Sequence, residues 1–83
     1  MDKLLITIEV PAVGQIFDIT VPESLSAEML IELLYQLLRE LGSGMYMPSG
    51  TEVLCRREDR RLLAGSRTLK DNDIQMGDHL LLF

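Results

Sequence analysis

Hydrophobic residues follow a period of two along the first part of the chain, a helical period in the middle, and a period of two again near the end. Apolar positions alternate over residues 4–10 and 16–21, and a turn that contains Pro and Gly separates these runs at 11–14. This alternation predicts two half-buried strands that form an antiparallel hairpin.

The strongest helical pattern covers residues 27–41, with Ser26 as its N-cap and glycines beyond its end. Leucines recur on this helix at steps of three and four and form one apolar stripe. The stripe consists of Leu30, Leu33, Leu34, Leu37 and Leu41. We expect it to face a sheet, so truncation of a central member, Leu37→Ala, should cost about 2–5 kcal/mol and prevent folding.

Three shorter strands are predicted after the helix, over residues 52–57, 61–63 and 79–83. The order ββαβββ, with one helix on a mixed four- to five-stranded sheet, is that of the α+β fold called the β-grasp. Its first and last strands would pair in parallel at the sheet centre, because the helical segment supplies the long crossover that such a pair needs. Residues 1–83 contain no internal repeat and are predicted to form a single domain.

The 83 residues carry a net charge of −5 and include one cysteine. An acidic protein repels nucleic-acid phosphates and anionic lipid headgroups, so we expect no nucleic-acid partner. No apolar run approaches the roughly 20 residues of a membrane span, so direct membrane insertion is not expected either. Cys55 alone cannot form an internal disulfide, which favours a cytoplasmic location.

Catalytic or metal-binding chemistry has little support among the residues that could carry it. Cys55 and the lone His79 fall on different predicted strands, and no acidic residue is placed to orient the histidine. One histidine without a second His or Cys ligand cannot begin a zinc site. The acidic segment 71–73 lacks the remaining ligands of a calcium loop and is read as a turn. We therefore predict a protein that is not an enzyme and has no cofactor.

Arginines are concentrated in the segment 56–61, which also contains two acidic residues. Residues 1–50, by contrast, have seven acidic against two basic residues. One interpretation of the segment is a solvated hairpin in which the arginines pair with the acids between them. The other is a basic partner-binding surface formed by Arg56, Arg57 and Arg60, whose affinity for an acidic protein would fall as salt is added.

Outward-facing apolar residues are the stronger indication of an interaction site. If Leu80 and Leu82 face the helix, then Leu81 and Phe83 point away from it, and Leu5 does the same on the neighbouring strand. We expect these three side chains to be contiguous and to bind a partner. Leu54 joins them only if it also points outward, which the alternation within 52–57 leaves open.

The helix also carries more apolar residues than one core-facing stripe requires. Ile31, Tyr35 and Leu38 widen its apolar arc beyond what a core-facing stripe needs, and we expect them to form a secondary partner surface. Alternatively, the segment 45–47, which contains two methionines and a tyrosine, covers these residues.

The C-terminal segment resembles the end of ubiquitin in its order of Leu69, an acidic turn, Ile74 and Gly77-Asp78. Further features extend over the whole chain: the Ile-Thr-Ile first strand, Phe17-Asp18-Ile19, the leucine-rich helix, Gly65-x-x-x-Leu69, Asp73-Ile74-x-x-Gly77-Asp78, and a last strand that is not followed by Gly-Gly. With these features the whole chain is most similar to the small YukD/EsaB proteins of bacterial type VII secretion systems and to the ubiquitin-like cytosolic domain of their EccD membrane component.

This resemblance implies a non-catalytic accessory or regulatory component that binds a protein of the secretion machinery. The expected partner is a membrane-associated secretion component, which would recruit a cytoplasmic protein to the inner face of the membrane. Without a Gly-Gly end, conjugation to other proteins is not expected. Two alternatives remain: a ubiquitin-like modifier or sulfur carrier whose Gly-Gly tail is missing from this chain, and a structural module that forms a weak homodimer through its outer sheet face.

Overall fold

The computed structural model describes residues 2–40, 50 and 52–83. Its elements are β1 (Lys3–Val10), a 3₁₀ turn η1 (Pro11–Val13), β2 (Gln15–Pro22), α1 (Ala27–Glu40), β3 (Leu54–Arg56), β4 (Arg61–Leu62) and β5 (His79–Leu82). These are the elements expected from the hydrophobic pattern, with shorter third and fourth strands. Leu41, the end of the expected leucine stripe, and the segment 45–47 lie outside the described residues.

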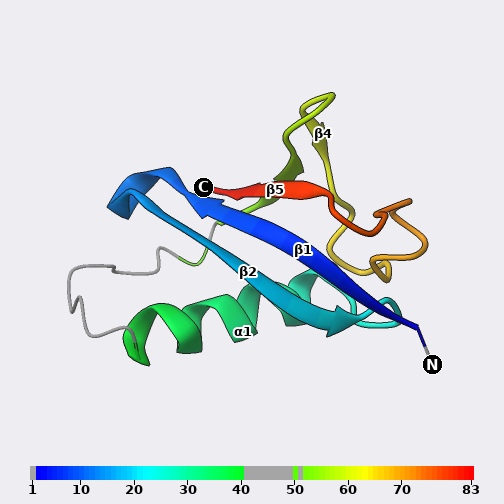
Figure 1. The fold of residues 1–83 in the computed structure, drawn as a ribbon, viewed down its shortest axis with the longest axis horizontal. Coiled ribbons are helices and arrows are strands. Elements are labelled where there is room, and N and C mark those ends of the chain that lie inside the picture. Colours follow the sequence, from blue (N-terminus) through cyan, green and yellow to red (C-terminus); the bar gives the residue numbers. More distant parts are fainter. Residues whose placement is uncertain (1, 41–49, 51) are drawn as a thin grey trace.

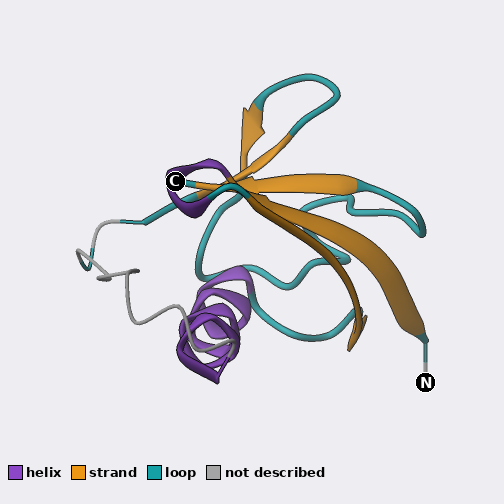
Figure 2. Ribbon diagram, turned by 60° about the vertical axis from the view of Figure 1, so that its left-hand side comes forward, coloured by secondary structure: helices purple, strands orange, loops and turns teal. Residues whose placement is uncertain are grey.

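The five strands form one mixed sheet in the order β2-β1-β5-β3-β4. β1 pairs with β5 in parallel, and the other neighbouring pairs are antiparallel. The helix α1 covers one face of the sheet, and the β3–β4 hairpin projects at the edge opposite β2 (Figure 1). Turning the molecule shows the helix and sheet as two separate layers (Figure 2). This arrangement confirms the predicted β-grasp, including its central parallel pair.

The hairpin of β1 and β2 turns through η1 and Gly14. Gly14 has a left-handed backbone with φ of 65°, and its N–H donates to the carbonyl of Pro11. A residue without a Cβ takes this conformation at no steric cost, which explains the glycine at the exit of the turn.

The start of α1 is held by a side-chain cap and by a distant turn. The Ser26 hydroxyl accepts the Met29 N–H at 3.2 Å, as expected of an N-cap. The N–H groups of Ala27 and Glu28 donate to the carbonyls of Arg67 and Gly65, each at 3.0 Å. The first helical amides are thus satisfied by the segment that follows β4.

The buried face of α1 differs from the expected leucine stripe. Its buried residues are Ala27, Leu30, Leu34 and Leu38. Leu33 is instead 39% exposed and Leu37 is only partly buried against the core, whereas Leu38, expected on the surface, is 2% exposed. Because leucine occupies positions 30, 33, 34, 37 and 38, two helical stripes were available, and packing against the sheet selects the one through Leu34 and Leu38.

Strand β3 directs Leu54 toward the helix. Leu54 is 1% exposed and belongs to the core cluster with Ile8, Leu80 and Leu82. Its pairing with Leu82 fixes this direction, because directly opposed residues of neighbouring strands point to the same side. The expectation that Leu54 could bind a partner is therefore wrong, and the orientation that the sequence left open is settled.

A buried asparagine organises the segment between β4 and β5. Asn72 is 3% exposed, and its side-chain oxygen accepts the Ala64 N–H at 2.8 Å. Its side-chain nitrogen donates to the carbonyls of Ala64 and Thr68 at 3.0 and 2.9 Å. The sequence indicated only a turn at 71–73. In the structure, the hydrogen bonds of the Asn72 side chain connect the segment that caps the helix to that turn.

Candidate functional site

One row of side chains crosses the sheet on the face that α1 does not cover. The strand registers pair Ile16 with Glu9, Glu9 with Leu81, Leu81 with Cys55, and Cys55 with Leu62. Opposed residues share a face, so these five side chains lie on the outer side of β2, β1, β5, β3 and β4 in turn. The part of the row over β5, β3 and β4 is apolar.

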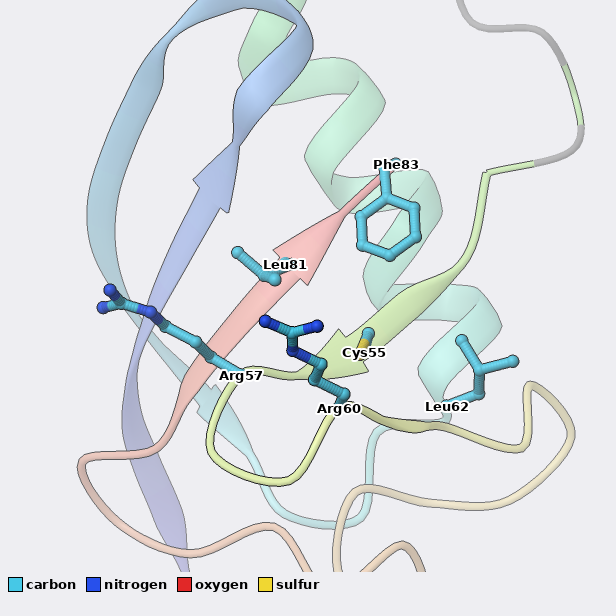
Figure 3. Close-up of a pocket in the computed structure, with 6 residues that line it drawn as sticks. All are labelled: Cys55, Arg57, Arg60, Leu62, Leu81 and Phe83. Atoms are coloured by element: carbon cyan, nitrogen blue, oxygen red, sulfur yellow. The ribbon is translucent and has the colours of Figure 1, made fainter.

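A hollow of about 460 Å³ lies over this apolar part of the row. Figure 3 shows the residues that line it: Cys55, Arg57, Arg60, Leu62, Leu81 and Phe83. Leu62 and Phe83 are 60% and 55% exposed, whereas Cys55 is buried although it points outward. The hollow thus has an apolar floor, and two of its apolar residues, Leu62 and Phe83, are exposed to solvent.

Two arginines supply positive charge to the hollow. In Figure 3 the guanidinium of Arg60 lies over the sheet near Leu81, and Arg57 extends toward β1. Both residues are exposed. Arg60 has a positive φ of 57°, a backbone conformation that a side chain rarely adopts outside tight turns. The β3–β4 turn therefore places these side chains beside the apolar floor.

A polar row borders the hollow on the side of β1. The Arg57 Nη1 lies 3.4 Å from the His79 Nδ1, and the His79 Nε2 lies 3.0 Å from the Glu9 carboxylate. A guanidinium can only donate, so Nδ1 accepts and Nε2 carries the proton that is donated to Glu9. Farther along, the Thr7 hydroxyl donates to Asp18 at 2.6 Å. These contacts separate the apolar residues at the two ends of the face.

Arg56, expected to bind a partner, does not line the hollow. Its guanidinium makes two hydrogen bonds to the Asp59 carboxylate, at 3.1 and 2.6 Å. These bonds hold the pKa of Asp59 at about 2, below its ordinary value. The solvated-hairpin interpretation is thus right for Arg56, while Arg57 and Arg60 face the hollow.

Leu5 points outward and is 48% exposed, as predicted, but it is not contiguous with Leu81. Leu81 pairs with Glu9, four residues beyond Leu5, which separates the two by about 13 Å along the strand direction. Leu5 instead lies beside Met76, with its N–H 3.2 Å from the Met76 sulfur. The expected three-residue patch is therefore wrong as to Leu5.

Leu62 and Cys55 complete the hollow, and the sequence analysis placed neither there. Both sit opposite each other on β3 and β4. The predicted strand over 61–63 was the available signal, since a strand next to β3 must add outward-facing side chains to the same surface.

The expected secondary surface on α1 is not formed. Leu38 is buried, and Ile31 packs against the core. The Tyr35 hydroxyl donates to the Glu52 carboxylate at 2.6 Å, and burial together with this carboxylate raises the pKa of Tyr35 to about 12. The helix instead exposes Met29 and Leu33.

The hollow presents apolar side chains and positive charge to a binding partner. Within residues 2–40, 50 and 52–83, no group of three or more His, Cys, Asp or Glu side chains could hold a metal ion. Among the same residues, no helix is long and apolar enough to cross a membrane. The chemistry of the hollow suits a protein segment that presents apolar and acidic side chains.

A protein-family model described as "WXG100 protein secretion system (Wss), protein YukD" matches residues 5–82, nearly the whole chain. Among curated proteins, no sequence matches this chain. The matched residues run from within β1 to the end of β5.

Solved structures of ubiquitin-like domains share this fold. The EccD5 ubiquitin-like domain from Mycobacterium xenopi has a TM-score of 0.79 at 20% identity, covering 100% of this chain and 94% of that one. The ubiquitin of Caldiarchaeum subterraneum has a TM-score of 0.75 at 19% identity, covering 98% and 91%. A chain of the MycP5-free ESX-5 inner membrane complex has a TM-score of 0.73 at 19% identity, covering 100% of this chain and 21% of that one. At these identities the likeness establishes the ubiquitin-like fold.

Proposed function

Because the chain belongs to the YukD family of the WXG100 protein secretion system, we propose that it is a non-catalytic interaction module of a type VII secretion system. The observation that carries this proposal is the hollow on the outer sheet face, where exposed Leu62 and Phe83 flank an apolar floor beside two arginines. Exposed apolar residues grouped in this way are typical of protein interaction sites.

The chemistry of the hollow indicates the kind of partner segment. Leu62, Leu81 and Phe83 would contact an aliphatic or aromatic side chain, and Arg57 and Arg60 would contact carboxylates next to it. The hollow therefore fits a short segment in which an apolar residue is flanked by Asp or Glu. Because the guanidinium groups are exposed, this part of the affinity should fall as salt is added.

The proposed partner is a membrane-associated component of the secretion system. The support is that a chain of the ESX-5 inner membrane complex contains a domain of this fold, so ubiquitin-like domains occur within such assemblies. Binding of this kind would hold a cytoplasmic protein at the inner face of the membrane without inserting it.

The test is capture of the detergent-solubilised secretion complex of the same organism by the tagged protein. Leu62→Glu and Phe83→Glu should each reduce capture at least about tenfold, because loss of a central anchor residue of an interface costs about 2 kcal/mol or more and about 1.4 kcal/mol is tenfold. Met76→Glu is the matched control, since Met76 is 64% exposed on the protein surface but does not line the hollow.

Circular dichroism would establish that all three variants remain folded. Unchanged capture by folded Leu62→Glu and Phe83→Glu would exclude the hollow as the binding site. Equal loss in all three variants would show that added negative charge, and not the hollow, governs the interaction.

A further inference from the structure

The two edges of the sheet differ in how well they are protected. β4 is two residues long, contains Arg61 and follows Arg60, which discourages the addition of another strand. β2 is eight residues long, and its one charge is Asp18, while its only proline, Pro22, ends the strand. The β2 edge therefore presents a long row of backbone groups that can pair with a further strand.

The pairing of β2 with β1 determines which backbone groups face outward. The Glu23 N–H donates to the carbonyl of Asp2 at 3.0 Å, which marks a hydrogen-bonded pair just beyond the strand. Hydrogen-bonded and non-bonded pairs alternate along an antiparallel ladder. Counting back along the register leaves three residues whose N–H and C=O both face away from β1: Ile16, Asp18 and Thr20.

The opposite side of β1 confirms this assignment. The Thr7 N–H donates to the carbonyl of Asp78, and the carbonyl of Leu5 accepts the Gly77 N–H. Leu5 and Thr7 thus direct their backbone groups to β5, so their register partners Thr20 and Asp18 are the non-bonded positions of β2. Within the described residues, no strand pairs with this edge.

A groove of about 380 Å³ runs beside the same edge, between β2 and α1. It is lined by Ile19, Thr20, Val21, Leu33, Gln36, Leu37 and Glu40. Leu33 is 39% exposed, and Met29, one turn earlier on α1, is 53% exposed. Leu33, which the expected core stripe would have buried, instead lines the groove.

The surroundings of the groove are acidic. The one charged residue that lines the groove is Glu40. Apart from Glu28, which lies against Gly65, the other charged residues of β2 and α1 are Asp18 and Glu32 against the single cation Arg39. Positive charge on the outer face, by contrast, lies on the β3–β4 turn at the other end of the sheet. An occupant of the groove should therefore be basic.

We propose that the β2 edge and its groove bind an extended segment of a partner protein, with aliphatic residues at alternate positions and Lys or Arg on either side. The backbone of this segment would pair with Ile16, Asp18 and Thr20, which span about five residues of an added strand. Every second side chain would enter the groove between Ile19 and Leu33. The intervening side chains would lie on the outer face.

This site is separate from the hollow over β5, β3 and β4. The nearest strand of the hollow, β5, is two strand spacings from β2, about 10 Å, and the groove lies on the helix-covered side of the sheet, opposite the hollow. Their charges are opposite, and neither shares a lining residue with the other. The domain can therefore hold an acidic and a basic segment at once and connect two components.

The probe is a synthetic peptide of about eight residues, with isoleucine or valine at alternate positions of its centre, polar residues between them, and two lysines at each end. Its binding is measured by fluorescence anisotropy, and amide hydrogen exchange of the protein is followed by NMR. At saturating peptide, exchange of the Ile16, Asp18 and Thr20 amides should slow at least about tenfold, because each would donate to the added strand. A peptide with glutamates in place of the lysines should bind at least about tenfold more weakly.

Two variants test the backbone and groove contacts separately. Thr20→Pro removes one outward N–H without breaking the ladder to β1, and should weaken binding about tenfold, whereas Thr20→Val keeps the N–H and should bind within about twofold of wild type. Leu33→Lys removes an apolar contact and repels the basic flanks, and Met76→Lys is its control on a distant surface.

Three results would overturn the proposal. Peptide binding without slower exchange of the three amides would place the peptide elsewhere. Equal binding of the acidic peptide would remove the charge argument. Slow exchange that appears without peptide and rises with protein concentration would show that a second copy of this chain occupies the edge.

Discussion

The packing of α1 makes a testable distinction between two leucines on one helix. The leucine pattern placed Leu33 in the core and Leu38 on the surface, whereas the structure leaves Leu33 39% exposed and Leu38 2% exposed. Leu38→Ala and Leu33→Ala make the same chemical change in the middle and last part of the same helix. Any gain in helix propensity is therefore nearly the same in both variants.

The expected losses of stability follow from these exposures. Leu38→Ala leaves a cavity among buried side chains and should lower the free energy of unfolding by about 2–5 kcal/mol. Leu33→Ala removes surface that is partly hydrated already and leaves an open site, so its cost should be about 1 kcal/mol. A domain of this size has only about 3–5 kcal/mol of net stability, so Leu38→Ala should be largely unfolded.

Urea denaturation followed by circular dichroism measures both values. The folded fraction without urea separates the two variants even if Leu38→Ala lacks a full transition. A loss for Leu33→Ala equal to or larger than that for Leu38→Ala would show that α1 packs on the sheet through the stripe first expected, and would also remove Leu33 from the proposed groove.

Two further predictions concern polar contacts. In the same urea experiment, Asn72→Ala should lower the free energy of unfolding by about 2 kcal/mol, because the N–H and carbonyl of Ala64 and the carbonyl of Thr68 lose their partner. Asp71→Ala changes the exposed neighbouring residue and should cost less than about 0.5 kcal/mol. The pKa of Asp59 is about 2 when folded, against an ordinary 3.8, so the stabilisation by Arg56 is complete above pH 3.8 and is lost as the pH falls through 2. Thermal melts should therefore show Asp59→Asn less stable than wild type near neutral pH, with the difference shrinking as the pH is lowered from 3.8 toward 2.

The fold was predictable because each element has a local signature. Alternation marks β1 and β2, and Ser26 marks the helix start. The face of α1 that is buried was not predictable, because Leu33 and Leu38 are the same residue type and only packing against the sheet distinguishes them. The role of Asn72 was hidden for a similar reason: its partners lie in a segment whose path depends on the whole fold.

The sequence predicted which face of the sheet carries the site, but not which residues of that face lie next to one another. Alternation correctly placed Leu81 and Phe83 on the outer face, since that requires only the inward orientation of Leu80 and Leu82. The distance from Leu5 to Leu81 depends on the register of the parallel pair β1–β5, which is set across the crossover and leaves no local pattern. The same limit applies to Leu62, which joins the hollow through its pairing with β3.

The register also bears on self-association through the outer face. A stacked dimer that covered both Leu5 and Phe83 would have to cover the polar row between them, where Arg57, His79 and Glu9 are linked. Removing such charged groups from water costs several kcal/mol per ion unless a partner replaces every lost contact. A segment bound only in the hollow leaves Glu9 and His79 in contact with water. It would contact the Arg57 guanidinium only on the side that faces the hollow. The register therefore favours a small contact with a different protein over face-to-face pairing of two copies.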